Sequence, residues 1–449
     1  MQTQRDHVHA YQFMVDRMTS ALVLGDPAAP DPPARRVSLA LIFGIVLAVL
    51  TSVGFGVYGV IKPGGNNAWR RPGVILVEKE TGTRYVMRDG VLYPMFNHAS
   101  ALLAQGGGAR VESISRESLT GLPHGPQTGI QGAPDPVPDA AKLVAGPVTT
   151  CPAPARAGQL AGVVVFAGLR WPERDMPEDR YVLVRDPAGT RYLVWRGLVH
   201  KLSDPAVPVA LGMAVSTEFS VTPGWLATAR AGGPFGRADI PGAGTPGPAV
   251  GGQKHPVGRL FRYGTADGER FAVLLADGLA PVDATEFALL AGRAGTAPPV
   301  QSNATEVAAA PASADRSMVG RLPDLLRLRP LDQDGWTPCA RHTTDGTRVQ
   351  ASMVLVQNVP LVGVADAAVV LLPPGSGLLA AGFPAPPNRR PEQFLITDQG
   401  VRHLIADDES VTALGYGGRP PFLVPAQVLD VIRTGPTLSR AALGASTRG

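Results

Sequence analysis

One stretch of sequence recurs four times along this chain, and the repetition constrains the fold more than any other feature. The segment TGTRYVMRDGVLYPMFNHASALLAQG, which begins at Thr81, reappears as AGTRYLVWRGLVHKLSDPAVPVALGM from Ala188. A third copy, DGERFAVLLADGLAPVDATEFALLAG, begins at Asp267, and a divergent fourth, PEQFLITDQGVRHLIADDESVTALGY, begins at Pro391. A match of this length is not a product of chance, so we expect four copies of one structural unit.

Each copy predicts a small α+β module, because an apolar strand, a glycine turn, a second strand and an Ala/Leu-rich helix follow one another. The turn glycines are Gly90, Gly197, Gly278 and Gly400. Aromatic residues at equivalent positions before them are Tyr85, Tyr192, Phe271 and Phe394. In three copies a Leu-containing segment then leads into Gly-Pro, and we expect chain-terminating turns there; these segments begin at Leu119, Leu226 and Leu429.

An apolar run near the N-terminus predicts a membrane anchor. From Val37 to Ile61 the chain reads VSLALIFGIVLAVLTSVGFGVYGVI, without a charged residue. This is longer than the ~20 residues that cross a bilayer as a helix. The 36 residues before the run and the Lys62-Pro63 pair after it do not match a secretory signal peptide, so we expect the helix to be retained.

Small residues recur every four positions in this run and form one ridge, which favours association with another membrane helix. The ridge residues are Ala40, Gly44, Ala48, Ser52 and Gly56. The alternative is that small residues are simply common in such helices. Positive charges flank both ends of the run, so the positive-inside rule does not orient it.

The segment before the span predicts a short amphipathic helix. Its apolar residues fall at helical spacing, and the polar face is mixed in sign, so we expect the stripe to contact a protein partner rather than the membrane surface. The stripe residues are Val8, Tyr11, Val15, Met18 and Leu22.

Two stretches lie outside the repeats, and each carries one cysteine, Cys151 and Cys339. We expect both stretches to form one central domain, with two repeats on either side of it in space. An isolated cysteine pair beyond the span favours a disulfide in an oxidising compartment, which would place the C-terminal region outside the cytoplasm. Two unrelated buried thiols are the alternative. A bridge would contribute about 4 to 5 kcal/mol in the chain-entropy model.

The expected domains, joined by Pro/Gly-rich linkers, follow from these patterns. They are a cytoplasmic stub (1–36), a transmembrane helix (37–61), repeat domains (71–130, 181–250, 255–315 and 391–449) and a central domain in two parts (140–180 and 318–390).

Composition and motifs exclude several function classes. A net charge of +4 over 449 residues, without a basic block, argues against nucleic acid as a partner. No P-loop occurs, and both GxGxxG matches lie in segments that cannot form a dinucleotide fold, the apolar run and a Pro-rich linker. Nucleophile-elbow, HExxH and CxxC patterns are also missing. We therefore predict no catalytic, cofactor-binding or metal-binding residue, and we expect surface or turn positions for four histidines, His124, His200, His255 and His403.

In combination, these features resemble the EccB membrane components of type VII (ESX) secretion systems in actinobacteria. The resemblance covers essentially the whole chain. It rests on the stub ending in ALVLGDPAAPDPPARR, the single span, the GTRYVMRDGVLYPMFNHASALLA repeat that follows, and one cysteine in each non-repeat stretch.

The resemblance implies an elongated, β-rich outer region with four repeat domains about a disulfide-linked centre. It also implies a scaffold in the inner-membrane secretion complex, single-pass with a cytoplasmic N-terminus, in contact with the FtsK/SpoIIIE-like ATPase EccC, the multispanning EccD and further copies of itself. ATP hydrolysis, proposed for the family, is the alternative. A third hypothesis is peptidoglycan binding by the repeats, with tryptophans stacking on sugars unless they pack in the core: Trp171, Trp195, Trp225 and Trp336.

Overall fold

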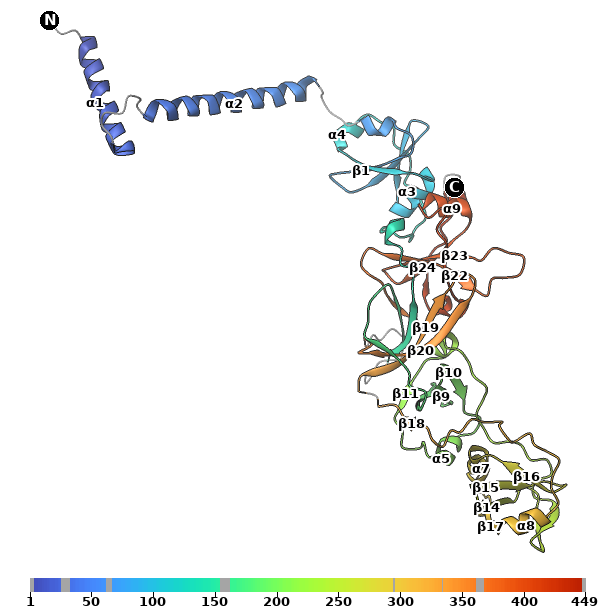
Figure 1. The fold of residues 1–449 in the computed structure, drawn as a ribbon. Helices are drawn as coiled ribbons and strands as arrows, with labels where there is room; N and C mark the ends of the chain where they lie inside the picture. Colours follow the sequence, from blue (N-terminus) through green and yellow to red (C-terminus); the bar gives the residue numbers. More distant parts are fainter. Residues whose placement is uncertain are drawn as a thin grey trace.

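The computed structural model of this chain describes residues 4–25, 33–61, 67–153, 162–293, 295–332, 334–360 and 367–445. Two long helices come first, α1 (Gln4–Leu24) and α2 (Pro33–Ile61). A β-rich region with several separate sheets follows and extends away from α2 in Figure 1. The predicted fold class, α+β with one apolar helix before a β-rich remainder, is confirmed.

The first two repeats share one topology, in which three antiparallel strands are followed by a helix and a fourth strand pairs parallel to the first. After a short 3-10 turn (Asn67–Arg70), the first repeat contains β1 (Val74–Glu78), β2 (Arg84–Arg88), β3 (Val91–Met95), α3 (His98–Gln105), β4 (Arg110–Ile114) and α4 (Arg116–Leu119). The second contains β8 (Arg180–Arg185), β9 (Arg191–Trp195), β10 (Leu198–Lys201), α5 (Val207–Ala210), β11 (Glu218–Ser220) and α6 (Pro223–Thr228).

The third and fourth repeats have the same strand pairing, with additions at their ends. The third contains a preceding hairpin, β12 (Pro246–Val250) and β13 (Gln253–Pro256), then β14 (Leu260–Thr265), β15 (Gly268–Leu274), β16 (Leu279–Val282), α7 (Ala284–Ala291), β17 (Val300–Asn303) and α8 (Ala304–Ala309). The fourth contains β22 (Gly377–Phe383), β23 (Gln393–Thr397), β24 (Val401–Ile405), α9 (Asp408–Ala413), β25 (Phe422–Pro425), α10 (Ala426–Asp430), β26 (Arg433–Thr434) and α11 (Arg440–Ala445).

Local sequence explains the hairpins and helix starts of these units. Asp89 and Gly90 join β2 to β3 with φ angles of 50° and 76°, the left-handed conformation that a two-residue type I′ turn requires. At the start of α3, the Asn97 side chain accepts a hydrogen bond from the Ser100 N–H at 2.9 Å, and Asp407 caps α9 in the same way. Arg196 and Gly197 have φ angles of 48° and 77° between β9 and β10, so the second repeat shares this turn, and the fourth shares the helix cap.

A turn forms at each of the three predicted places, where the N–H three positions further on donates to the carbonyl of Leu119, Leu226 or Leu429. The tail does not end the unit there, because in every repeat it continues beside the third strand. Four parallel bridges record this pairing: Leu92 with His124, Val199 with Ala231, Leu279 with Ala312, and Ile405 with Leu438. The third tail pairs although it lacks Gly-Pro. Its contact is a backbone hydrogen bond, from the Leu279 N–H to the Pro311 carbonyl at 2.7 Å, which side-chain patterns do not encode.

A six-stranded sheet lies at the centre of the β-rich region, in the order β21-β6-β5-β19-β20-β7. The first non-repeat stretch supplies β5 (Val148–Ala153), β6 (Gly162–Ala167) and β7 (Glu173–Asp175), with a 3-10 turn before them (Ala140–Lys142). The second supplies β19 (Trp336–Thr344), β20 (Val349–Gln357) and β21 (Val369–Leu371). Segments about 190 residues apart in the sequence are therefore neighbouring strands.

Two segments that the sequence assigned to the central domain (318–390) belong to repeats in the structure. Strand β22 (377–383) pairs with β23 and is the first strand of the fourth repeat, upstream of the predicted start at Pro391. A short strand, β18 (Arg329–Pro330), pairs with β8, and Leu325 is buried in the core of the second repeat. Both segments were misplaced because an isolated apolar strand carries no signal that identifies its partner.

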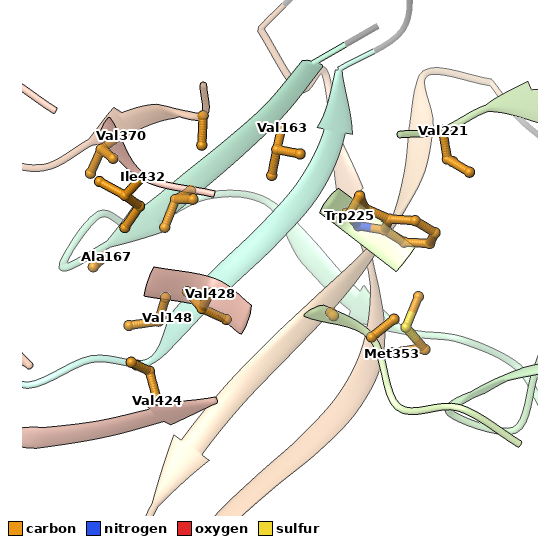
Figure 2. Packing of buried hydrophobic residues seen from close by; sticks show 14 of the residues in the cluster. Val148, Val163, Ala167, Val221, Trp225, Met353, Val370, Val424, Val428 and Ile432 are labelled. Atoms are coloured by element: carbon orange, nitrogen blue, oxygen red, sulfur yellow. The ribbon is translucent and has the colours of Figure 1, made fainter. Parts of the chain in front are cut away.

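Hydrophobic clusters join neighbouring domains into one body. The largest cluster combines Val148 and Val163 of the central sheet with Trp225 of the second repeat and Val424 and Val428 of the fourth (Figure 2). A second cluster joins helix α3 of the first repeat to the fourth repeat, and a third joins the second repeat to α7 of the third. The central sheet therefore has repeats one and four on one side and repeats two and three on the other, as Figure 1 shows.

Candidate functional site

Helix α2 has the length and composition of a membrane span over Val37–Tyr58, with a mean hydropathy of 2.5 and no buried residue. All five ridge residues are exposed, and no neighbouring atom lies within 4 Å of a Cβ built at Gly44 or Gly56. The Thr51 hydroxyl donates to the Leu47 carbonyl at 2.8 Å, so this polar group is satisfied within the helix. Helix α2 ends at Ile61, the predicted end of the span, and Lys62 and Pro63 lie outside the described residues.

Helix α1 is exposed along its predicted apolar stripe. Tyr11 is 70% exposed, Met18 is 67% exposed and Leu22 is 83% exposed, and Val8 and Val15 are also exposed. Other apolar side chains outside the stripe are equally exposed, including Phe13 and Met14. An apolar helix surface of this kind is stabilised when something else covers it.

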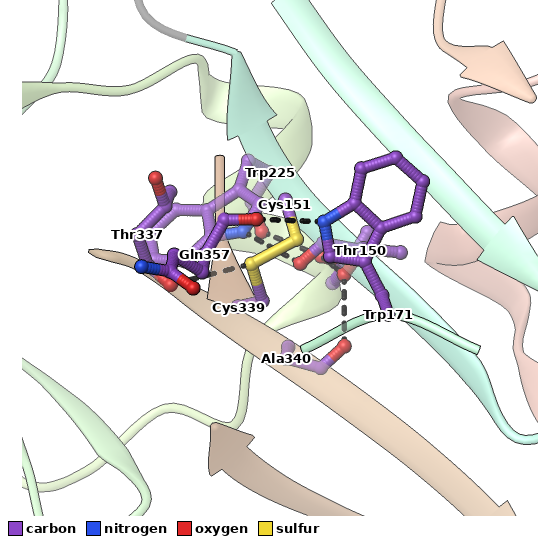
Figure 3. Close-up of a disulfide and its surroundings, with 9 residues drawn as sticks. Thr150, Cys151, Trp171, Trp225, Thr337, Cys339, Ala340 and Gln357 are labelled. Atoms are coloured by element: carbon purple, nitrogen blue, oxygen red, sulfur yellow. Dashed lines mark hydrogen bonds between the residues drawn. A yellow bond between two sulfur atoms is a disulfide. The ribbon is translucent and has the colours of Figure 1, made fainter. Parts of the chain in front are cut away.

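The two cysteines form the predicted disulfide, with Cα atoms 4.4 Å apart. Strand β5 is antiparallel to β19, and this register places Cys151 directly opposite Cys339. Both residues are fully buried (Figure 3). The bridge therefore ties together the two non-repeat stretches at the middle of the β-rich region.

The repeat aromatics all lie in the second strand of their sheets, β2, β9, β15 and β23. In the first copy, the Tyr85 hydroxyl donates to the Glu78 carboxylate at 3.0 Å, and in the second the Tyr192 hydroxyl donates to Asp186 at 3.2 Å. Phe271 and Phe394 have no hydroxyl, and arginine side chains lie over their rings instead, Arg262 and Arg402. These contacts hold each sheet together, and we propose that the four positions are structurally equivalent.

Glu78 was not singled out by sequence reasoning, although it is only 3% exposed. Besides the tyrosine, it accepts hydrogen bonds from Arg116 at 2.6 Å and Thr81 at 2.8 Å. The hydrogen bond from Arg116 is the main cause that holds the pKa of Glu78 below its usual value. A glutamate at the end of an apolar strand, seven residues before a tyrosine, is the signal that could have indicated this contact.

Two of the four histidines are buried, so their predicted surface or turn position is wrong. His200 and His403 lie in the third strands of their repeats, and their Nδ1 atoms hydrogen bond to the carbonyls of Gly233 (2.8 Å) and Pro436 (3.1 Å). A side chain at Gly232 would meet the His200 ring at 2.4 Å, which explains glycine in that tail. Burial lowers the pKa of both histidines.

The tryptophans have structural contacts. Trp225 is fully buried and donates to the Thr150 carbonyl at 3.1 Å, and Trp195 is 7% exposed. The Trp171 indole donates to the Gln357 carbonyl at 2.7 Å, and Arg174 lies over the Trp336 ring. Among the described residues, no group of three or more His, Cys, Asp or Glu side chains is placed to hold a metal ion.

A family model described as "Type VII secretion system ESX-1, transport TM domain B" matches residues 1–447. The chain belongs to the EccB family. This EccB-family chain is 27% identical to the "ESX-1 secretion system ATPase EccB1" of Mycobacterium tuberculosis, over 98% of this chain and 94% of that protein. It is 29% identical to the "ESX-3 secretion system ATPase EccB3" of Mycolicibacterium smegmatis, over 97% of this chain and 89% of that protein.

Solved EccB structures have the same fold. A chain in the "Structure of an intact ESX-5 inner membrane complex, Composite C3 model" is similar at a TM-score of 0.62 and 23% identity, covering 99% of this chain and 95% of that one. The "Structure of EccB3 dimer from the ESX-3 core complex" is similar at a TM-score of 0.57 and 26% identity, covering 82% of this chain and 99% of that one. EccB proteins of these systems are thus components of inner-membrane complexes.

Proposed function

We propose that this chain is a structural subunit of a type VII secretion membrane complex, in which it scaffolds an EccC-type ATPase, an EccD-type multispanning protein and further copies of itself. The observation that carries the proposal is the family match over residues 1–447, which includes the stub, the span and the whole β-rich region. The dimeric EccB3 structure and the ESX-5 complex are consistent with self-association.

The domain packing supports a mechanical rather than a catalytic task. Shared apolar clusters between successive domains resist bending, because separating the domains would expose buried side chains to water. A rigid outer region can hold a fixed spacing between its membrane helix and its distal repeat.

The proposed orientation places α1 in the cytoplasm and the β-rich region outside. The Cys151–Cys339 disulfide supports this placement, since such bonds persist in oxidising compartments. In this orientation, the exposed apolar surface of α1 and the ridge of α2 are the surfaces available to membrane and cytoplasmic partners.

ATP hydrolysis is the second candidate function, because the names of the EccB relatives contain the word ATPase. The sequence contains no P-loop. We therefore propose a non-enzymatic role. The third hypothesis, binding of peptidoglycan through tryptophans, loses support from the burial of Trp225 and Trp195 in cores.

The test is purification of the tagged full chain from its native membrane in mild detergent, followed by mass spectrometry of the retained proteins. The scaffold proposal requires a high-mass complex that contains EccC- and EccD-like proteins. A lone monomer under several mild detergents would contradict it. Steady phosphate release that survives stringent purification would instead support the ATPase, and pelleting with cell-wall sacculi would support wall binding.

A further inference from the structure

A cavity of about 500 Å³ lies in the third repeat. This repeat is at the far end of the β-rich region from α2, as Figure 1 shows. Its walls are the linker from the second repeat (237–240 and 243–244), the turn into β14 (256–260), and the end of α7 with residues that follow it (290, 293 and 295–297). Apolar side chains form part of the lining, including Leu260 and Leu290, which are almost fully buried. The cavity therefore combines an apolar wall with charged groups.

Three arginines line this cavity, and their charges are not fully compensated. Arg237 is paired with Asp204 at 2.6 Å. Neither Arg259 nor Arg293 takes part in any ion pair between described residues. The single carboxylate among the described lining residues is Asp239, so the cavity has an excess of positive charge.

The side chain of Arg259 is also incompletely satisfied within the protein. Its Nε is buried without a hydrogen-bond partner. Arg262 and Arg341 share this feature, but each has a carboxylate nearby, at 3.5 Å from Glu269 and 2.8 Å from Glu173 respectively. Native structures rarely leave a buried donor unpaired, because the lost hydrogen bonds to water are not replaced.

The positive charge of Arg259 also affects the pKa of a neighbouring histidine, His255. Burial, and then the positive charge of Arg259, holds the pKa of His255 below its usual value. Because a nearby cation disfavours a second one, this cavity suits an anion and disfavours a basic ligand.

We propose that this cavity binds a small organic anion, with its phosphate or carboxylate group held by Arg259 and Arg293 and its apolar part against Leu260 and Leu290. Both anion classes fit the planar, multidentate donor face of guanidinium groups. The site does not depend on the proposed scaffold function, because none of these residues lies in α1, α2 or the central sheet.

The test is calorimetric titration of the purified full chain in mild detergent, at fixed ionic strength, with phenyl phosphate and with benzoate. Benzyl alcohol is the uncharged control. We expect at least one of the two anions to bind, and the comparison between them identifies which group the site prefers. We expect no comparable binding of benzyl alcohol, because the arginines supply the attraction.

Arg259→Gln and Arg293→Gln are each expected to weaken binding by about tenfold or more, as expected for loss of a charge-assisted hydrogen bond. Arg270→Gln, an exposed arginine of β15 outside the cavity, is the matched control and should bind as wild type. Arg293 is itself exposed, so its variant tests the site even if Arg259→Gln misfolds. Absence of binding by both anions, or equal binding by wild type and Arg293→Gln, would overturn the proposal.

Discussion

The hydroxyl groups of Thr150 and Thr228 lie 2.8 Å apart and form a buried hydrogen bond between the central sheet and the second repeat. Thr150 lies in β5 beside Cys151, and Thr228 ends α6. The Trp225 indole donates to the Thr150 carbonyl in the same contact, as Figure 3 shows. Hydrogen bonds are directional, so these two bonds inside an apolar cluster favour one relative orientation of the central sheet and the second repeat.

Trp225→Ala should destabilise the β-rich region by about 3 to 5 kcal/mol, because it removes a fully buried ring and leaves the Thr150 carbonyl without its donor. Urea unfolding of the full chain in detergent, followed by circular dichroism, measures this change. Phe96→Ala, at a 40% exposed ring, is the control and should have a much smaller effect. Equal effects of the two substitutions would contradict the importance of the contact.

Replacing both cysteines, with Cys151→Ala and Cys339→Ala, should lower the free energy of unfolding by about 5 kcal/mol. The bridge spans 188 positions, and the chain-entropy model assigns a larger stabilisation to longer loops. The urea midpoint of the double variant, compared with wild type with and without reductant, tests this. A double variant as stable as the oxidised wild type would exclude a stabilising disulfide.

Stability should fall in acid partly through His342. Burial lowers its pKa to about 4, and neither ring nitrogen has a hydrogen-bond partner. The unfolded chain, with a pKa near 6.5, therefore binds a proton more readily than the folded protein. This contribution is complete above pH 6.5 and decreases toward pH 4, by about 3 kcal/mol in total.

His342→Leu should accordingly flatten the pH dependence of stability between pH 6.5 and pH 4 relative to wild type. Unfolding by urea at several pH values in this window measures it. His7→Gln, an exposed change on α1, should retain the wild-type slope. If His342→Leu has the same slope as wild type, the histidine is not the group that titrates.

Tyr85→Phe should lower stability by about 1 to 2 kcal/mol, because Glu78 loses one of its three side-chain donors while it stays buried. Phenylalanine occupies the corresponding strand position in the third and fourth repeats, so the ring itself is expected to fit. Thermal unfolding detects the change, and Tyr11→Phe on exposed α1 is the control. A wild-type melting temperature for Tyr85→Phe would show that the hydroxyl contributes nothing.

Ala48→Ile on the ridge of α2 should weaken self-association in the membrane, because a larger side chain prevents close approach of a second helix. Co-purification of two differently tagged copies of the full chain measures the association. Val46→Ile, a similar enlargement off the ridge, should leave co-purification unchanged. Loss of association in both variants, or in neither, would argue against the ridge as the contact.

Several features follow from the sequence by itself. The uncharged run, the four repeated segments and their glycine turns are local patterns, and the helices and hairpins that they predict depend mainly on nearby residues. The disulfide was also predicted, because the two cysteines are an isolated pair beyond the span, one in each stretch outside the repeats. These predictions did not require knowledge of distant contacts.

The tertiary structure alone decided the partners of short segments and the burial of polar side chains. Strand β22 joins the fourth repeat, and the tail at Pro311 pairs with Leu279, through backbone hydrogen bonds that leave no mark in the residue pattern. His200 is buried because Phe235 and Gly232, more than 30 positions away, pack on its ring. Such contacts depend on which surfaces meet in the folded chain, and local periodicity does not specify that.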